Sequence, residues 1–113
     1  MKKIEFKKID DIDIITPVGE LTFNNIEDLN NFIKERIKKN KFKIIYNMVS
    51  VTWIDSLGLG LIAKSVKQAL INNSRVCLVK PRENILQLFK LCSLINLVEV
   101  FDSVEQSVEY LNS

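Results

Sequence analysis

The chain of 113 residues contains no histidine, and it has only two cysteines, three glycines and two prolines. The absence of histidine excludes imidazole acid–base catalysis and the commonest zinc sites. Cys77 and Cys92 each lie in an apolar stretch, so we expect two buried, reduced thiols rather than a disulfide or a redox pair. We expect no bound metal, no cofactor and no catalytic residue.

A dominant charge and a long apolar run are also missing. Sixteen basic and 14 acidic side chains give a net charge of +2, which is not the basic field that a nucleic-acid-binding protein needs. No run approaches the roughly 18 apolar residues of a transmembrane helix, and residues 1–6 lack the apolar segment of a signal peptide. We therefore expect a cytoplasmic protein with no membrane insertion and no direct contact with nucleic acid.

The composition is that of one globular domain. Apolar residues make up 47% and charged residues 27% of the chain, which are ordinary values for a folded protein. No internal repeat, low-complexity tract or glycine/serine linker divides the chain. We expect a single domain over residues 1–113.

The apolar pattern predicts strands that alternate with helices. Residues 4–16 alternate between apolar and polar side chains on both sides of a turn at Asp10-Asp11, which predicts a hairpin that ends at Pro17. Short apolar runs predict three further strands, at 42–48, 76–79 and 97–101. Helical spacing predicts four helices. The first ends near Lys39 and is capped by Thr22, Asn24 or Asn25, and the second extends over about 57–72. The third is opened by Pro81 and carries Ile85, Leu88, Phe89 and Cys92 on one face, and the fourth carries Val104, Val108 and Leu111 after a capping box formed by Asp102 with Glu105 or by Ser103 with Gln106.

Strands that alternate with helices after residue 42 imply a parallel sheet with right-handed crossovers. The first hairpin adds an antiparallel strand at its edge. The expected fold class is α/β, with a mostly parallel sheet of four to five strands packed by about four helices.

The run Trp53–Gly60 places an acid, a hydroxyl and two glycines at the start of the second helix. In one interpretation Ser56 only caps this helix, and Gly58 and Gly60 let the helix pack close to the sheet. In the other, Ser56 carries a removable phosphate, which the free N–H groups and the positive end of a helix can accommodate.

The apolar spacing of this helix predicts its buried and exposed faces. The inward positions are predicted to be Leu59, Ile62, Val66, Ala69 and Leu70. Those predicted to point outward, toward a partner, are Leu57, Gly58, Leu61 and Lys64.

Two phosphate-site patterns overlap the same glycines. Residues 58–63 match the dinucleotide fingerprint G-x-G-x-x-G/A, but Asp55, Ser56 and Leu57 separate the strand from the first glycine. A single small domain also lacks the second half that a dinucleotide needs. Residues 58–65 are one residue short of a P-loop and keep helical spacing, so the extended anion nest cannot form there. A small nucleotide-dependent oxidoreductase is therefore less favoured than the two functions described below.

The segment Asp55-Ser56-Leu57-Gly58-Leu59-Gly60 resembles the D-S-x-G-L-G signature of STAS domains of the anti-sigma factor antagonist family. The resemblance extends over nearly the whole chain: Gly19-Glu20-Leu21 matches the G-E-L/I-D element, Ile44–Asn47 matches a strand that ends in aspartate in the family, and Ile85–Leu94 matches the late helix. Thr22 and Asn47 replace two acidic residues of the family pattern, and Leu57 replaces a residue that is often small.

This resemblance implies the STAS fold and a function. Ser56 corresponds to the phosphoacceptor, and the unphosphorylated form binds a serine-kinase anti-sigma factor, so that the sigma factor is released. The kinase phosphorylates the serine and ends the complex, and a phosphatase reverses the modification. We expect the partner surface to include Asp55, Leu57, Gly58, Leu61, Thr22 and Asn24. The main alternative is a non-switching STAS scaffold subunit of a signalling or lipid-transport assembly.

Overall fold

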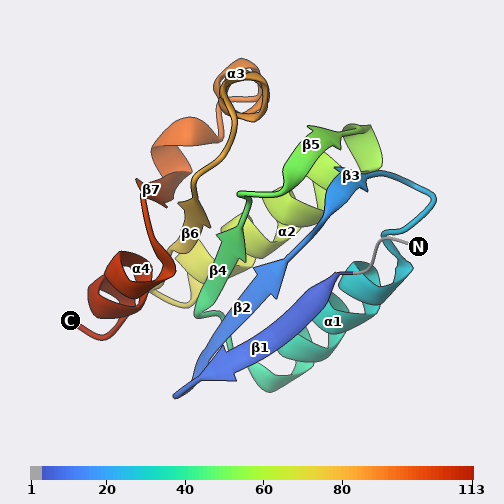
Figure 1. The fold of residues 1–113 in the computed structure, drawn as a ribbon. Coiled ribbons are helices and arrows are strands. Elements are labelled where there is room, and N and C mark those ends of the chain that lie inside the picture. Colours follow the sequence, from blue (N-terminus) through green and yellow to red (C-terminus); the bar gives the residue numbers. More distant parts are fainter. Residues whose placement is uncertain (1–3) are drawn as a thin grey trace.

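The computed structural model describes residues 4–113 as a five-stranded sheet, a separate two-stranded sheet and four α-helices (Figure 1). In chain order the elements are β1 (Glu5–Ile9), β2 (Ile12–Thr16), β3 (Gly19–Leu21), α1 (Glu27–Lys39), β4 (Ile44–Asn47), β5 (Val51–Ile54), α2 (Ser56–Ile71), β6 (Val76–Val79), α3 (Glu83–Leu91), a short 3₁₀ turn (Ile95–Leu97), β7 (Val98–Phe101) and α4 (Val104–Leu111).

The large sheet has the strand order β1-β2-β4-β6-β7. Strands β1 and β2 form an antiparallel hairpin, and each of the other neighbouring pairs is parallel. The predicted α/β class, the mostly parallel sheet with its antiparallel N-terminal strand and the four helices are therefore confirmed. Among residues 4–113, no helix is both long and apolar enough to cross a membrane.

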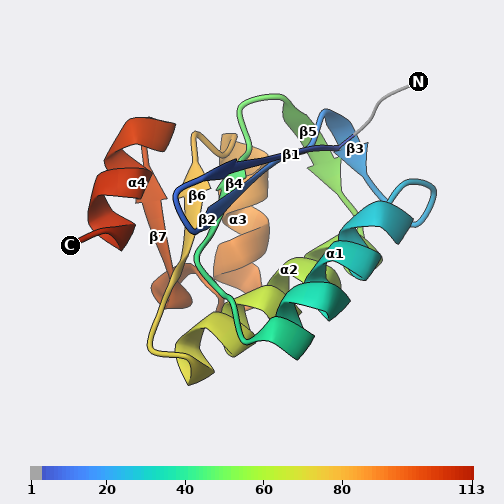
Figure 2. The ribbon, with the colours of Figure 1, turned by 90° about the horizontal axis from the view of Figure 1, so that it is seen from below.

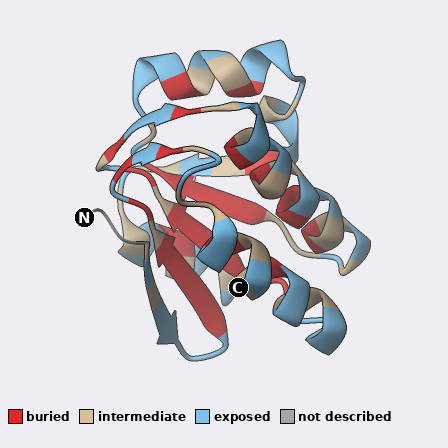
Figure 3. Cartoon of the chain, turned by 90° about the vertical axis from the view of Figure 1, so that its right-hand side faces the viewer, coloured by how far each residue is buried: buried red, intermediate tan, exposed pale blue. Residues whose placement is uncertain are grey.

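The two faces of the large sheet have separate apolar cores. Helices α1, α2 and α3 cover one face with the larger core, which includes Leu29, Ile62 and Phe89. Helix α4 covers the other face, where it packs on Ile14, Ile45 and neighbouring residues. Figure 2 shows α4 on one side of the sheet and the other three helices on the opposite side. In Figure 3 the strands are mostly buried and each helix exposes its outer surface.

A buried ion pair joins the hairpin to α1. Asp13 of β2 is 3% exposed, and the guanidinium of Arg36 donates to both of its carboxylate oxygens, at 2.7 and 3.0 Å. The same guanidinium lies 4.2 Å from the centre of the Phe32 ring, and that ring stacks on Phe6 of β1. The hydrogen bond to Asp13 raises the pKa of Arg36, so this cation stays charged and fixes α1 on the sheet.

Several predicted helix ends need correction. Helix α1 begins after Ile26, without a side-chain cap, so neither Thr22, Asn24 nor Asn25 is its N-cap. Helix α3 begins at Glu83, two residues after Pro81. The predicted cap of α4 by Ser103 is confirmed, because its hydroxyl accepts from the Gln106 N–H at 3.1 Å.

The two cysteines differ in environment, although both are free. Cys77 is buried as predicted, and burial raises the pKa of its thiol to about 12. Cys92 is exposed at the end of α3, so its predicted burial is wrong. The helix ends at Leu91, and Cys92 therefore does not continue the buried face formed by Ile85 and Phe89.

Candidate functional site

The second, two-stranded sheet forms the support of the candidate site. Strands β3 and β5 pair in parallel, with Glu20 opposite Trp53 and Leu21 opposite Ile54. This second sheet is not among the elements predicted from the sequence. It brings the Gly19–Leu21 segment next to the strand that leads directly into α2, at the top right of Figure 1. Two sequence motifs that lie more than thirty residues apart thereby meet at the start of α2.

Asp55, rather than Ser56, is the N-cap of α2. Its carboxylate accepts from the Gly58 N–H at 2.9 Å and from the Phe23 N–H at 3.0 Å. These hydrogen bonds, first the one from Gly58 and then the one from Phe23, hold the pKa of Asp55 below its ordinary value. One charged side chain therefore satisfies a free donor of the helix and also fixes the loop after β3.

Ser56 is the first residue of α2 and is exposed. Within residues 4–113 its hydroxyl makes no hydrogen bond, whereas the Asp55 carboxylate beside it makes two. The interpretation of Ser56 as the helix cap is therefore wrong, because Asp55 has that role. Ser56 lies at the positive end of a 16-residue helix.

The loop after β3 is held by its own polar side chains. The Asn25 side chain accepts from the Thr22 N–H at 2.8 Å and donates to the Glu20 carbonyl. The Thr22 hydroxyl accepts from the Asn24 N–H at 3.4 Å. Thr22 and Asn24 thus flank Phe23, whose N–H bonds to Asp55, and the structure places both of them at the same end of the molecule as Ser56.

Gly58 is buried, so its prediction as an outward-facing residue is wrong. A Cβ atom at this position would lie 2.5 Å from the Leu21 carbonyl oxygen. Gly58 therefore has a structural role, because only a residue without a side chain lets α2 approach β3 this closely. The predicted close packing is confirmed for Gly58 but not for Gly60, where a Cβ would have no atom within 4 Å.

Leu57 and Leu61 do not form one exposed surface. Leu57 is 55% exposed, as predicted. Leu61 is only partly exposed and packs against the large core, so its prediction as a free partner anchor is wrong. The buried positions of α2 are Gly58, Ile62, Ser65, Val66 and Ala69.

Exposed apolar side chains are frequent on the two segments that contain the paired strands β3 and β5. Five of the eleven large apolar residues that are exposed in the described part of the chain lie on residues 18–23 and 49–57: Val18, Phe23, Val49, Trp53 and Leu57. Phe23 is 67% and Trp53 is 46% exposed. Neither aromatic residue is predicted as a site residue from the sequence, because their segments meet only through the pairing of β3 with β5. We call these five residues the apolar surface.

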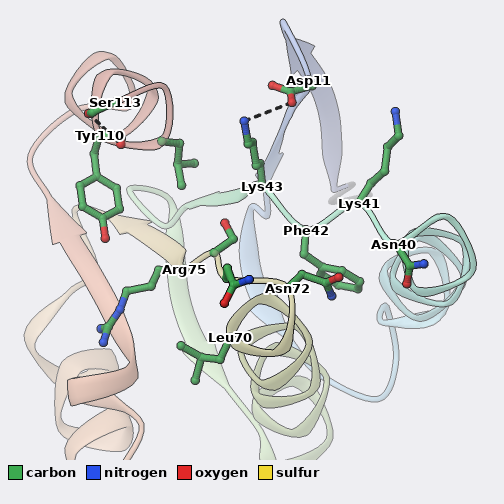
Figure 4. Close-up of a pocket in the computed structure, with 13 residues that line it drawn as sticks. Asp11, Asn40, Lys41, Phe42, Lys43, Leu70, Asn72, Arg75, Tyr110 and Ser113 are labelled. Carbon is green, nitrogen blue, oxygen red and sulfur yellow. Dashed lines mark hydrogen bonds and ion pairs between the residues drawn. The ribbon is translucent and has the colours of Figure 1, made fainter.

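A separate groove of about 960 Å³ lies at the other end of α2. Leu70 and Asn72 line it (Figure 4), and the 16 residues of α2 place it roughly 24 Å from Ser56. Three of the charged residues that line it, Asp11, Lys43 and Arg75, are already in ion pairs within the chain. Lys43 lies 3.2 Å from Asp11, and Arg75 lies 3.1 Å from Glu99. Ser56 and the groove are therefore separate sites.

The double role of Asp55 can be tested with two substitutions. Asp55→Asn keeps one side-chain oxygen, which can accept from the Gly58 N–H. It replaces the oxygen that accepts from the Phe23 N–H with an NH₂ group, which cannot accept. We expect the Phe23 amide proton to exchange roughly tenfold faster in this variant, while that of Gly58 changes little. Asp55→Ala should accelerate exchange at both amides, and Asp102→Ala, at an exposed aspartate, should affect neither. Equal acceleration at both amides in Asp55→Asn would contradict the double role.

The lowered pKa of Asp55 also predicts a dependence on pH. A carboxyl group whose pKa is lower in the folded state stabilises that state above its unfolded pKa, and this contribution disappears as the pH falls through the folded value. In the wild-type chain, the protection factors of the Phe23 and Gly58 amides, which compare observed with intrinsic exchange at the same pH, should therefore fall below about pH 4. This acid-dependent loss of protection should be absent in Asp55→Asn.

Comparison with known proteins gives matches over nearly the whole chain. The family model of the STAS domain matches residues 3–107. A candidate anti-sigma factor antagonist of Thermotoga maritima is 31% identical over 108 residues, which cover 92% of this chain and 93% of that protein.

Solved structures show the same architecture. The crystal structure of a candidate anti-sigma factor antagonist from Thermotoga maritima has a TM-score of 0.85 at 25% identity, over 97% of this chain and 95% of that one. The anti-sigma factor antagonist SpoIIAA in its unphosphorylated form has a TM-score of 0.82 at 18% identity, over 97% of this chain and 98% of that one. The phosphorylated form of the Bacillus SpoIIAA has a TM-score of 0.79 at 19% identity, over 95% and 97%.

Proposed function

Because the chain belongs to the STAS domain family, among the anti-sigma factor antagonists, we propose that it is a binding module switched by phosphorylation of Ser56. It binds a serine-kinase anti-sigma factor while Ser56 is unphosphorylated, and it separates from that partner after phosphorylation. It acts by binding rather than by catalysis, as a single domain over residues 1–113, in the cytoplasm.

The observation that carries this proposal is the position of the Ser56 hydroxyl. It is exposed at the start of α2, and within residues 4–113 it has no hydrogen bond that phosphorylation would break. A phosphate there adds about −1.5 to −2 units of charge near pH 7, next to the free N–H groups and positive dipole of the helix. The fold can therefore accept the modification without unfolding.

The surroundings of Ser56 explain how a phosphate would change binding. The apolar surface offers Phe23, Trp53 and Leu57 as side chains that a partner could cover. Covering a phosphate in the same contact would remove a dianion from water, which costs much more free energy than covering a hydroxyl. The neighbouring Asp55 carboxylate adds repulsion of the same sign. A partner that fits the unmodified surface should therefore bind the phosphorylated one weakly.

The two chemical steps of the cycle need only groups from the partners. In the kinase, the Ser56 Oγ attacks the terminal phosphorus of a nucleoside triphosphate, loses its proton, and the nucleoside diphosphate leaves. In the phosphatase, water attacks the same phosphorus, and inorganic phosphate leaves as the serine hydroxyl re-forms. SpoIIAA, which shares the fold, has been solved in both phosphorylated and unphosphorylated forms, and this supports the proposal.

Substitutions of Ser56 test the acceptor. Ser56→Ala should change the free energy of unfolding by only about 0.5 kcal/mol, because Asp55 provides the cap. It should keep its affinity for the anti-sigma factor and accept no phosphate from the kinase. Ser56→Asp should bind roughly tenfold more weakly, because it has only part of the charge of a phosphate. Intact mass and calorimetric titration measure these outcomes.

The matched control is Ser113→Ala, at an exposed serine of the C-terminus, which should be phosphorylated and bound like the wild type. Phosphorylation of Ser56→Ala to the wild-type extent would reject Ser56 as the acceptor. Full affinity of the phosphorylated wild-type chain would instead favour the non-switching scaffold.

A further inference from the structure

Gly60 has no structural reason to be glycine. It lies inside α2 in the ordinary helical conformation, because the only described glycine with positive φ is Gly19. It is exposed, and a Cβ at its position would have no atom within 4 Å. Glycine in the interior of a helix is less favourable than alanine, because it loses more backbone entropy on folding. The isolated fold would therefore be more stable with a side chain here.

The position of Gly60 on the helix relates it to the proposed switch. The buried residues of α2 include Gly58, Ile62 and Ala69, and at 100° per residue Gly60 points away from them. Ser56 lies one turn earlier on the same side, and residues four apart are neighbours on a helix surface. A side chain at position 60 would therefore stand beside the Ser56 hydroxyl and would extend above the helix backbone.

We propose that Gly60 is a partner contact, at which the backbone of the serine-kinase anti-sigma factor comes into van der Waals contact with α2. This inference rests on the proposed function and identifies a residue that determines how closely the partner can approach. Phosphoryl transfer requires the Ser56 Oγ to come within roughly 3–3.5 Å of the phosphorus it attacks. A kinase that brings the phosphorus of its nucleotide this close to Ser56 must lie directly on the first turns of α2. A methyl group at position 60 would then keep the backbone of the kinase from making this close contact.

This proposal predicts opposite effects of one substitution on stability and on binding. Gly60→Ala should raise Tm by a few degrees, because it improves helix propensity in open space. The same variant should bind the purified anti-sigma factor kinase of its own organism roughly tenfold more weakly, and its Ser56 should be phosphorylated more slowly at a subsaturating concentration of the chain. Gly60→Leu should show a larger loss of binding in a chain that still folds.

The matched control is Lys67→Ala. Lys67 is also exposed on the outward side of α2, but it lies about two turns beyond Gly60, so both its binding and its phosphorylation should equal those of the wild type. Wild-type affinity and phosphorylation rate in Gly60→Ala would overturn this inference and leave the proposed function standing. A lower Tm in Gly60→Ala would also overturn it, because the glycine would then be structural. If the wild-type chain itself binds none of the anti-sigma factor kinases of its organism, the proposed function fails, and this inference fails with it.

Discussion

Replacing Ile62 with lysine is expected to unfold the chain. Ile62 is fully buried in the core between α2 and the large sheet, and the one buried acidic side chain of residues 4–113, Asp13, is already paired with Arg36. An ammonium group there loses its hydration without gaining a partner. The expected loss exceeds about 4 kcal/mol, which is a large part of the roughly 5–15 kcal/mol that stabilises a typical domain. Circular dichroism and thermal denaturation measure the result.

Two leucines on the same helix provide graded controls. Leu57→Lys changes a residue that is 55% exposed, so the variant should fold normally and lose affinity for the partner. Leu61→Lys changes a residue that packs partly on the core, and we expect an intermediate loss of about 1–3 kcal/mol. A folded Ile62→Lys variant, or an unfolded Leu57→Lys variant, would show that the orientation of α2 described above is wrong.

Replacing Arg36 with alanine should have the second largest effect. Among residues 4–113, the substitution leaves the carboxylate of Asp13, 3% exposed, with the ammonium of Lys8, at 3.8 Å, as its remaining ion-pair partner. Breaking a buried ion pair by removing one partner typically costs about 3–5 kcal/mol, because the remaining charge is buried without compensation. The lost contact between the guanidinium and the Phe32 ring adds to this loss. Urea denaturation of Arg36→Ala measures the sum.

The comparison with a surface pair isolates the effect of burial. Lys39 pairs with Glu35 on the exposed side of the same helix, and Lys39→Ala should leave the urea midpoint almost unchanged. In the double variant Asp13→Leu/Arg36→Met, most of the lost stability should return, because no buried charge is left unpaired. Equal midpoints for Arg36→Ala and Lys39→Ala would show that the Asp13–Arg36 pair does not stabilise the fold.

The large sheet was predictable because its strands and helices carry strong local signals. The apolar run at 42–48 and the strand at 76–79 are nearly continuous because both strands are central and covered on both faces. The β3–β5 sheet was not predictable in the same way. Strand β3 has only three residues, too few for a clear alternating pattern, and the four-residue β5 exposes two consecutive residues in its middle, so it does not alternate with a period of two.

The Asp55-Ser56 turn was recognised from the sequence, but the orientation of α2 was only partly predicted. The apolar spacing of the helix predicts Leu59 on its buried face and Gly58 on its exposed face. In the structure Gly58 is buried against the Leu21 carbonyl oxygen, and the buried hydroxyl of Ser65 is satisfied by a hydrogen bond with the Tyr46 hydroxyl at 2.7 Å. Both effects depend on atoms that are distant in the chain, so hydropathy spacing within the helix could not show them.

Which residue caps the N-terminus of α2 also depends on atoms that are distant in the chain. Asp55, Ser56 and the polar residues of 22–25 are all good N-cap types, and the sequence does not indicate which of them has a neighbour to bond. Asp55 becomes the cap because it can also accept from the Phe23 N–H. Within residues 4–113 the Ser56 hydroxyl is left without a hydrogen bond, and the proposed switch depends on that.

The most direct test of the switch is the affinity of one partner for two forms of the same chain. The wild-type chain is phosphorylated on Ser56, confirmed by intact mass and fragment analysis, and each form is titrated against the purified anti-sigma factor by calorimetry. We expect the phosphorylated form to bind at least roughly a hundredfold more weakly, with Tm values of the two free forms within a few degrees of each other. Equal affinities of the two forms for an anti-sigma factor that binds the unphosphorylated chain would contradict the account.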